Sequence, residues 1–163
     1  MPRRLFLSVV LSLILLPPTI AFADFSGRVV GVTDGDTIKV MHNGKAEKIR
    51  LHGIDCPERA QPFGTKAKQF TSAMVFGKAV TIQEHGQDMY GRTIGDVILP
   101  DGRVLNRELV AAGFACWYHP YAPHDSTLAR LEEDARGKKR GLWADPNPVP
   151  PWCYRKRQKG REC

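Results

Sequence analysis

The chain has 163 residues and a formal net charge of +7, which leaves room for one domain of ordinary size. This basic balance favours an acidic partner such as nucleic acid, anionic lipid or a cell-surface polymer, and composition does not choose among them. The four cysteines include no C-x-x-C pair, which argues against a structural zinc site.

Residues 1–23 are predicted to be a secretory signal peptide. Arg3 and Arg4 give a positive start, an almost wholly apolar run follows, and Ala21-Phe22-Ala23 is an A-x-A cleavage site. The apolar run is shorter than the roughly 20 residues that a membrane-spanning helix needs, although an uncleaved membrane anchor is the alternative. Cleavage leaves 140 residues, in which 22 Lys and Arg face 17 Asp and Glu, a net charge of +5. We therefore expect a secreted or periplasmic protein with no stable membrane anchor.

The segment after the signal peptide is typical of a meander of three short strands. The first contains Val29–Val32, the second is Thr37–Met41 and the third is Glu47–Leu51. Asn43-Gly44 lies between the second and third strands and is a strong hairpin signal, because both residues accept a positive φ.

Further along, two more strands alternate with helices. A turn region over residues 55–64 precedes a helix from Thr65 to about Phe76. The other predicted elements are strands over Ala79–Glu84 and Arg92–Leu99 and helices over Val104–Ala112 and from Ser126 to about Lys139. This order predicts an α+β domain over residues 24–144, a five-stranded OB-fold Greek-key β-barrel with three α-helices.

The C-terminal tail, residues 145–163, is rich in proline and then basic. Its basic side chains crowd a short stretch: Arg155, Lys156, Arg157, Lys159 and Arg161. We expect the tail to be extended and mobile unless a disulfide ties it. Its charge could hold nucleic acid through phosphate contacts or could simply be solvated, and the two interpretations are evenly matched.

Carboxylates at two places could hold a cation. Asp34 and Asp36 flank Gly35 before the second strand, and Asp55 follows the third strand. If the strands pair as the hairpin implies, these groups meet at one end of the barrel. Two carboxylates, a backbone carbonyl and waters suit Ca²⁺ or Mg²⁺. On Asp-Gly-Asp alone, a plain β-turn is the better interpretation.

Two arginines and one further acid complete a set of groups for phosphodiester chemistry. Arg50 lies on the polar face of its strand, and Arg92 follows Tyr90-Gly91. Two arginines aimed at one phosphate would hold it by bidentate, charge-assisted hydrogen bonds. Glu58 follows Pro57 and could act as a general base on water. Each of these groups could by itself be a solvated surface side chain, and their joint occurrence is what indicates a phosphodiesterase.

Four motifs resemble the staphylococcal nuclease family in order and spacing: Asp34-Gly35-Asp36-Thr37, Ile49-Arg50-Leu51, Ile54-Asp55-Cys56-Pro57-Glu58 and Asp88-Met89-Tyr90-Gly91-Arg92. The resemblance runs from about Phe25 to Trp143. It implies an OB barrel of five strands with three helices. It also implies a nuclease that hydrolyses DNA and RNA with little sequence preference and leaves 3′-phosphates.

The resemblance assigns a role to each site residue. Asp36, Asp55 and the backbone carbonyl of Cys56 would be ligands of Ca²⁺, and Asp34 would act through water or in an outer layer. A threonine stands in place of Cys56 in the best-known member, but a backbone ligand should survive that change.

In the same family, Arg50 and Arg92 would clamp the scissile phosphate. Glu58 would orient or deprotonate the attacking water, and Tyr90 would lie near the nucleotide. The loops after Glu58 and before Tyr90 are shorter here than in the best-known member, which could change substrate preference. The basic tail lies outside the resemblance.

The cysteines and aromatic residues give secondary hypotheses. In the family's fold the segments of Cys56 and Cys116 run close together, which implies a disulfide between them and leaves Cys153–Cys163 as the second pair. The alternative for Cys116 is a buried free thiol. Three aromatic residues, Trp117, Tyr118 and Tyr121, could form a platform for stacking bases, although Trp117 fits the core slightly better.

Three functions compete. A calcium-dependent nuclease, acting as a monomer on DNA and RNA, accounts for the whole set Asp36, Arg50, Asp55, Glu58 and Arg92. A non-catalytic OB module that binds nucleic acid has no need of this set. A basic protein that binds anionic lipid or cell wall would use the charge and leave the set unexplained.

Overall fold

The computed structural model describes residues 24–163, so the predicted signal peptide lies outside the described residues. The strands are β1 (Phe25–Asp34), β2 (Thr37–His42), β3 (Lys45–Leu51), β4 (Ile54–Asp55), β5 (Ala79–Gln87), β6 (Thr93–Ile98) and β7 (Cys116–Trp117). The helices are α1 (Gly64–Val75), α2 (Leu105–Ala111), α3 (Ser126–Gly137) and α4 (Pro151–Gln158), with a 3₁₀ turn, η1 (Gly141–Ala144). No helix among these is long and apolar enough to cross a membrane.

Five strands close into a barrel in the order β1-β2-β3-β6-β5, which confirms the predicted five-stranded barrel. All pairs are antiparallel except β3 with β6. Asn43 and Gly44, with φ of 49° and 76°, form the predicted turn between β2 and β3. Ile49 and Leu51 are buried in the barrel, and the period-two alternation of a strand leaves Arg50 between them on the other face.

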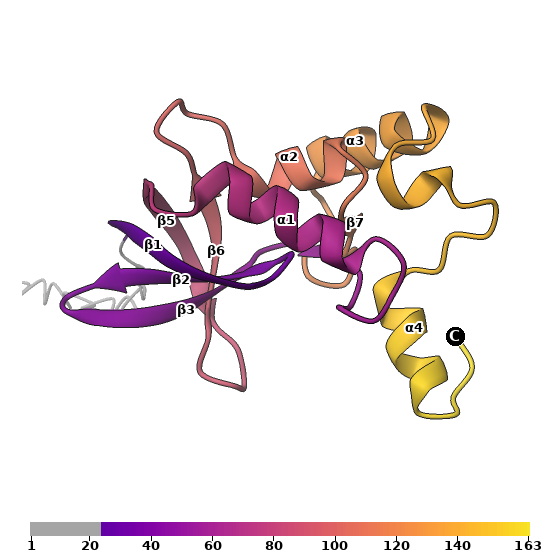
Figure 1. Ribbon diagram of the computed structural model, residues 1–163, viewed down its shortest axis with the longest axis horizontal. Helices are drawn as coiled ribbons and strands as arrows, with labels where there is room; N and C mark the ends of the chain where they lie inside the picture. The colour runs from indigo at the N-terminus through magenta and orange to yellow at the C-terminus, as the bar shows by residue number, and fades with distance from the viewer. Residues whose placement is uncertain (1–23) are drawn as a thin grey trace, which may run out of the picture.

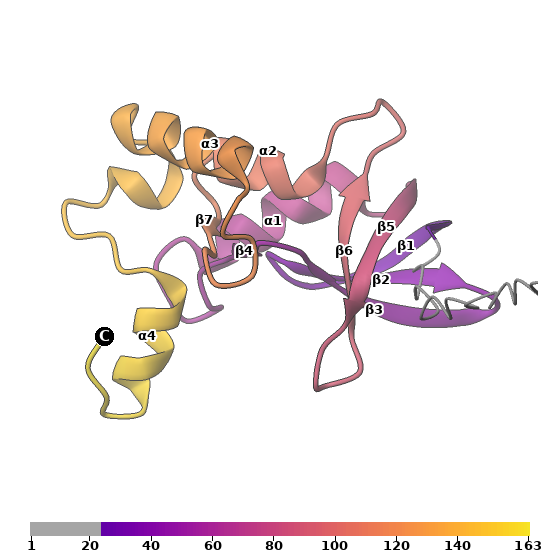
Figure 2. The ribbon, with the colours of Figure 1, turned by 180° about the vertical axis from the view of Figure 1, so that it is seen from behind.

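Helices α1, α2 and α3 lie along one side of the barrel, while α4 lies at the end of the molecule opposite the β2–β3 hairpin (Figures 1 and 2). Helix α3 is capped by Asp125, whose carboxylate accepts from the N–H groups of Thr127 and Leu128. Helix α1 starts one residue before the predicted Thr65, and its N-cap position is Phe63, which makes no side-chain cap bond. Its start is set instead by the loop that carries Glu58.

The C-terminal tail contains α4, a fourth helix that the sequence analysis did not predict. Pro151 occupies its first turn, where the missing N–H costs nothing because no partner exists there. Cys153 and Cys163 form the predicted tail disulfide. The tail was expected to be extended and mobile unless a disulfide tied it, and this disulfide ties it.

The predicted Cys56–Cys116 disulfide is wrong, because both cysteines are free and buried. Strand β4 pairs with β7 so that Asp55 and Cys116 are direct partners. Successive residues of a strand point to opposite faces, so Cys56 is directed away from Cys116. Accordingly, Cys56 lies in the main core with Ala67, while Cys116 packs in a second cluster with Trp143. The alternative of a buried free thiol at Cys116 is confirmed.

Candidate active site

The first segment of the site is the turn between β1 and β2. Asp34 pairs with Thr37, so Gly35 and Asp36 form a two-residue turn, which confirms the turn interpretation of Asp-Gly-Asp. The N–H of Asp36 donates to Asp34 Oδ1 at 3.2 Å. A Cβ at Gly35 would lie 2.8 Å from Sγ of Cys56. The lack of a side chain thus lets this turn pack against the segment that follows β4, and the turn also presents Asp36 to the site.

Asp36, Asp55 and Arg50 form a compact group of opposite charges at this end of the barrel. Arg50 Nη2 lies 3.2 Å from Asp36 Oδ2 and 3.1 Å from Asp55 Oδ1. Arg50 Nη1 donates to the carbonyl oxygens of Leu51 and Ile54 at 2.8 and 2.9 Å, and these two bonds fix the orientation of the guanidinium group. The strand pairing therefore brings together two carboxylates and one of the two arginines that the sequence singled out.

Burial shapes the charges of this group. It raises the pKa of Asp55, and burial together with the charge of Asp36 raises the pKa of Asp34 to about 6. Burial alone would lower the pKa of Arg50, but the carboxylates of Asp36 and Asp55 more than offset this, so the pKa of Arg50 is raised. The site thus concentrates negative charge that a bound cation would stabilise.

The donor atoms fit a hard divalent cation. The carboxylates of Asp36 and Asp55 share one guanidinium nitrogen as a neighbour, so both lie within reach of a single ion. The N–H of Cys56 donates to Asp36 Oδ2 at 2.7 Å, which orients that carboxylate. Within residues 24–163, no hydrogen bond is made to the carbonyl oxygen of Cys56, so it is available as a ligand. Oxygen donors of this kind suit Ca²⁺ or Mg²⁺.

Glu58 is held by a tight loop between β4 and α1. Its carbonyl oxygen accepts from the N–H of Gln61 at 2.8 Å, and its own N–H donates to Gln61 Oε1 at 3.2 Å. A Cβ at Gly64 would lie 1.9 Å from the carbonyl oxygen of Glu58, so only glycine fits there. These contacts fix the backbone of Glu58 beside Asp55, while its side chain stays partly exposed.

A third arginine, which sequence reasoning missed, meets both acids. Arg155 of α4 places Nη2 2.8 Å from Asp55 Oδ2 and Nη1 2.8 Å from Glu58 Oε1. Nη1 also donates to Asp55 Oδ1 at 3.1 Å. Although burial acts to lower the pKa of Arg155, these hydrogen bonds raise it. The tail therefore contributes to the site in a way that its composition did not predict.

Arg92 directly precedes β6, whose first residue, Thr93, pairs with Ile49 of β3. Its Nε donates to Asp88 Oδ2 at 2.7 Å, and it makes no hydrogen bond or ion pair with Asp36 or Asp55. Its guanidinium also lies 5.6 Å from the centroid of the Tyr90 ring. Within the described part of the chain, neither Nη atom of Arg92 has a hydrogen-bond partner, so two donors remain for a ligand.

The predicted aromatic residues divide into core and surface. Trp117 packs against the core and donates from Nε1 to the carbonyl oxygen of Ala122 at 2.9 Å, so it is a core residue. Tyr118 and Tyr121 form an edge-on pair with ring centroids 4.9 Å apart, and Tyr121 is largely exposed. The Tyr118 ring also lies 5.4 Å from that of Trp152 in α4. Tyr90, 75% exposed, stands apart next to Arg92.

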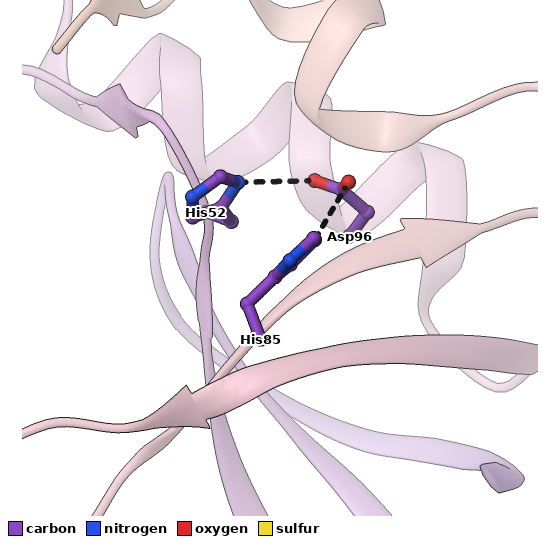
Figure 3. A group of neighbouring side chains, drawn as sticks. All are labelled: His52, His85 and Asp96. Carbon is purple, nitrogen blue, oxygen red and sulfur yellow. Dashed lines mark hydrogen bonds and ion pairs between the residues drawn. The ribbon is translucent and has the colours of Figure 1, made fainter. Parts of the chain in front are cut away.

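A second polar cluster joins three strand regions of the barrel. In Figure 3 the rings of His52, after β3, and His85, in β5, point toward the carboxylate of Asp96 in β6. The three potential ligand atoms lie within 4.8 Å of one another. Sequence reasoning missed this cluster because its members are far apart in the chain.

Comparisons with known proteins indicate the family of this chain. A family model described as "Staphylococcal nuclease homologue" matches residues 48–145. An Escherichia coli O157:H7 protein named "Uncharacterized endonuclease" is 46% identical over 136 residues, 83% of this chain and 88% of that protein. A Shigella flexneri protein named "Micrococcal nuclease" is 37% identical over 161 residues, 93% of this chain and 92% of that protein.

A protein of Haemophilus influenzae, also named "Uncharacterized endonuclease", is 40% identical over 133 residues, 81% of this chain and 74% of that protein. The matched family is metal-dependent, in keeping with the acidic site. The barrel, the family match and these relatives agree on a nuclease that acts on nucleic acid as a phosphodiester hydrolase of the endonuclease type. The chain belongs to the staphylococcal nuclease family.

Proposed function

We propose that this chain is an exported, calcium-dependent nuclease that hydrolyses DNA and RNA with little sequence preference and leaves 3′-phosphates. The observation that carries the proposal is the convergence of Asp36, Asp55 and Glu58 with Arg50 at one end of the barrel. A module that only binds nucleic acid has no need to bury two aspartates beside an arginine, because burying a charge is costly unless function or pairing requires it.

In this proposal Asp36, Asp55 and the carbonyl of Cys56 hold the calcium ion. When bound, calcium would supply positive charge that stabilises the growing negative charge on the phosphoryl oxygens. Burial and the nearby charge of Asp36 raise the pKa of Asp55, and a bound ion would stabilise the charged form of this carboxylate. Asp34 is separated from Asp36 by Gly35 alone and would contact the ion through a water molecule.

The remaining groups act on the substrate. Two backbone carbonyls fix Nη1 of Arg50, and Nη2, which now faces Asp36 and Asp55, would turn to the phosphate once calcium binds those carboxylates. Arg92, anchored through Nε by Asp88, keeps both Nη atoms for the same phosphate. Glu58 lies on a fixed backbone with a partly exposed carboxylate and accepts a proton from the attacking water.

Substrate class follows from what the site recognises. Arginines and a cation bind the phosphodiester group itself, which carries no sequence information, so DNA and RNA are both substrates. Tyr90 and Tyr121 are exposed, and the half-buried Tyr118 packs edge-on against Tyr121, so these rings offer surface on which any base can stack. The predicted signal peptide would direct the enzyme to the periplasm or the medium, and cell fractionation of the full-length chain tests that destination.

The test is digestion of plasmid DNA and of an RNA by the purified mature chain, with calcium and with a chelator. We expect cutting that needs calcium and that falls by about 10²-fold or more in Glu58→Gln and in Arg92→Ala. Products should bear 5′-hydroxyls that accept a labelled phosphate from a kinase without prior phosphatase treatment. Binding to DNA without cutting, under any divalent ion, would support the non-catalytic OB module instead.

A further inference from the structure

Helix α4 reaches the candidate active site through one side chain. Arg155 meets Asp55 with both Nη atoms and meets Glu58 with one of them, at 2.8 to 3.1 Å. Such a bidentate, charge-assisted contact is among the stronger polar interactions in proteins. The side chain of Asp55 is only 3% exposed, whereas that of Arg155 is 43% exposed. The guanidinium therefore enters the site from the solvent side, where a substrate would approach.

Several contacts fix α4 in this position. Gln61, in the loop that carries Glu58, donates from Nε2 to the carbonyl oxygen of Val149 at 2.6 Å. The Trp152 ring packs on Tyr118, and the Cys153–Cys163 disulfide closes the segment after the helix. A solvated basic tail would need none of these contacts. These contacts hold α4 so that Arg155 lies at the candidate active site.

Arg155 and a bound cation would compete for the same oxygens. Both Oδ atoms of Asp55 are engaged by guanidinium nitrogens, one by Arg50 and Arg155 together and the other by Arg155 alone. A calcium ion at Asp55 must displace part of this contact. The displaced guanidinium remains tethered to α4 at the edge of the site, where the nearest strong anion would be the phosphate of the substrate.

We propose that Arg155 is a third active-site arginine, which pairs with Asp55 and Glu58 in the free enzyme and binds the substrate phosphate in the working enzyme. This inference rests on the proposed calcium-dependent nuclease activity. The planar fork of a guanidinium matches a phosphate as well as it matches a carboxylate, which allows the same side chain to serve both states. Pairing in the free enzyme also offsets the charge of Glu58 until substrate arrives.

The test compares Arg155→Gln and Arg155→Lys with the wild type in two measurements. The first is calorimetric titration of the mature chain with calcium alone. The second is kcat/KM for DNA cleavage at saturating calcium. Arg157→Gln is the matched control, because it removes the same charge from an exposed position of the same helix. Thermal melting followed by circular dichroism checks that each variant is folded.

We expect Arg155→Gln to bind calcium about tenfold more tightly, because a competing charge-assisted contact is lost. At saturating calcium it should cut DNA at least about tenfold more slowly, because a phosphate contact is lost. Arg155→Lys should lie between the wild type and Arg155→Gln in both calcium affinity and cutting rate. Arg157→Gln should change calcium affinity less than about twofold. A role in stability alone would weaken calcium binding and cutting together, so the opposite signs distinguish the two roles.

Two results would overturn the inference. Unchanged or weaker calcium binding in Arg155→Gln would mean that Arg155 does not compete at Asp55. Equal or faster cutting at saturating calcium would mean that Arg155 only blocks the site and does not serve the reaction. A wild-type chain that neither binds calcium nor cuts DNA would instead reject the proposed function itself.

The cluster of His52, His85 and Asp96 carries an independent inference. His52 Nε2 lies 3.2 Å from the carbonyl oxygen of Tyr121, which can only accept, so Nε2 bears the proton. A neutral His52 then turns the lone pair of Nδ1 toward Asp96 Oδ1, 3.9 Å away. No proton lies between these two acceptors in this state, so a cation placed there would bind both of them. His85 Nε2 lies 3.0 Å from the other oxygen of Asp96.

The geometry points to a transition-metal site, for an ion such as Zn²⁺, formed by His52 Nδ1, His85 Nε2 and a carboxylate oxygen of Asp96. These atoms lie within 4.8 Å of one another. The His52 and His85 rings are stacked with centroids 4.2 Å apart, so both rings would rotate to direct their nitrogens at one ion, with water as a fourth ligand. The outer contacts are those typical of a metal site. The Tyr121 carbonyl orients His52, and Asn106 Nδ2 donates to Asp96 Oδ1 at 2.8 Å.

The test is titration of the calcium-saturated mature chain with Zn²⁺ alone, in competition with a chromophoric chelator. We expect one zinc ion per chain, with affinity reduced at least about tenfold in His85→Ala. His124→Ala removes an exposed histidine outside the cluster and should leave zinc binding unchanged. Absence of zinc binding by the wild type, or equal zinc binding by His85→Ala, would overturn this assignment.

Discussion

The barrel end and the C-terminal tail both contribute side chains to the candidate active site, but they are built differently. Asp36 and Asp55 are 7% and 2% exposed, and they are fixed by strand pairing and by close packing of backbone. Arg155 is half-exposed on a short helix that is held by a disulfide and a few polar contacts. In the proposed mechanism the buried barrel end supplies the ligands of the metal ion, and the tail supplies Arg155, which exchanges Asp55 and Glu58 for the substrate phosphate.

This difference has a physical basis in local stability. Segments with many buried contacts open only when the domain unfolds, whereas segments with few such contacts open at lower cost. Substitutions at the barrel end should therefore abolish function or destabilise the whole domain. Substitutions in the tail should change rates and affinities while the barrel stays folded.

Asp36→Asn should have the largest effect on activity. It removes one of two buried carboxylates without changing shape, so calcium binding and DNA cutting should fall by at least about 10²–10³-fold. Calorimetry with calcium and a plasmid-cutting assay measure both. Asp101→Asn, at an exposed carboxylate paired with Arg103, is the control and should keep full activity. Retention of cutting in Asp36→Asn would contradict the proposal that the buried carboxylates of the barrel end are required for catalysis.

Gly64→Ala should have the next largest effect. Its Cβ would lie 1.9 Å from the carbonyl oxygen of Glu58, so the loop must shift, at a cost of about 1–3 kcal/mol of folding free energy. Because Glu58 moves, kcat should fall by about tenfold as well. Gly137→Ala, in α3 with open space at its Cβ, is the matched control. Urea unfolding and kcat together measure the effect, and a stable, fully active Gly64→Ala would be inconsistent with it.

Removal of the tail disulfide, by Cys153→Ser with Cys163→Ser, should loosen the tail and leave the barrel end unchanged. A short closed loop of this kind contributes roughly 2–3 kcal/mol, and here that stabilisation acts on α4. We expect faster hydrogen exchange in α4, little change in the exchange of β1–β3, and cutting slowed several-fold. Equal protection of α4 in the two proteins would mean that the disulfide does not position Arg155.

The surface aromatics should have the smallest effect. Tyr118→Ala and Tyr121→Ala each remove one ring from the edge-on pair, and loss of a stacked base costs about 1 kcal/mol at the low end of the usual range. The Michaelis constant for single-stranded DNA should rise by about fivefold, with kcat nearly unchanged. An unaltered Michaelis constant in both variants would remove the platform hypothesis.

The parts of the site that could be predicted from sequence are those where a motif implies a backbone shape. Asn43-Gly44 set the register of β2 and β3, and that register places Arg50 beside Asp36. The turn at Asp34-Gly35-Asp36 was likewise predictable, because Asp-Gly is a common turn dipeptide. The structure adds that a side chain at Gly35 would collide with Cys56.

The parts that could not be predicted depend on tertiary contacts. Arg155 is one of five basic residues in the tail, and nothing in composition separates it from its neighbours. Pro151 at the start of a helix and the spacing of Cys153 and Cys163 were the available signals. The Cys56–Cys116 pairing failed because proximity of two segments does not say which face each side chain takes.

The most direct test of the whole account is a crystal structure of the mature chain with calcium and a nucleoside 3′,5′-bisphosphate. We expect one ion bound by Asp36, Asp55 and the carbonyl of Cys56, and a phosphate contacted by Arg50 and Arg92. An ion bound away from the two aspartates, or a phosphate that touches neither arginine, would contradict the assignment of this barrel end as the nuclease site.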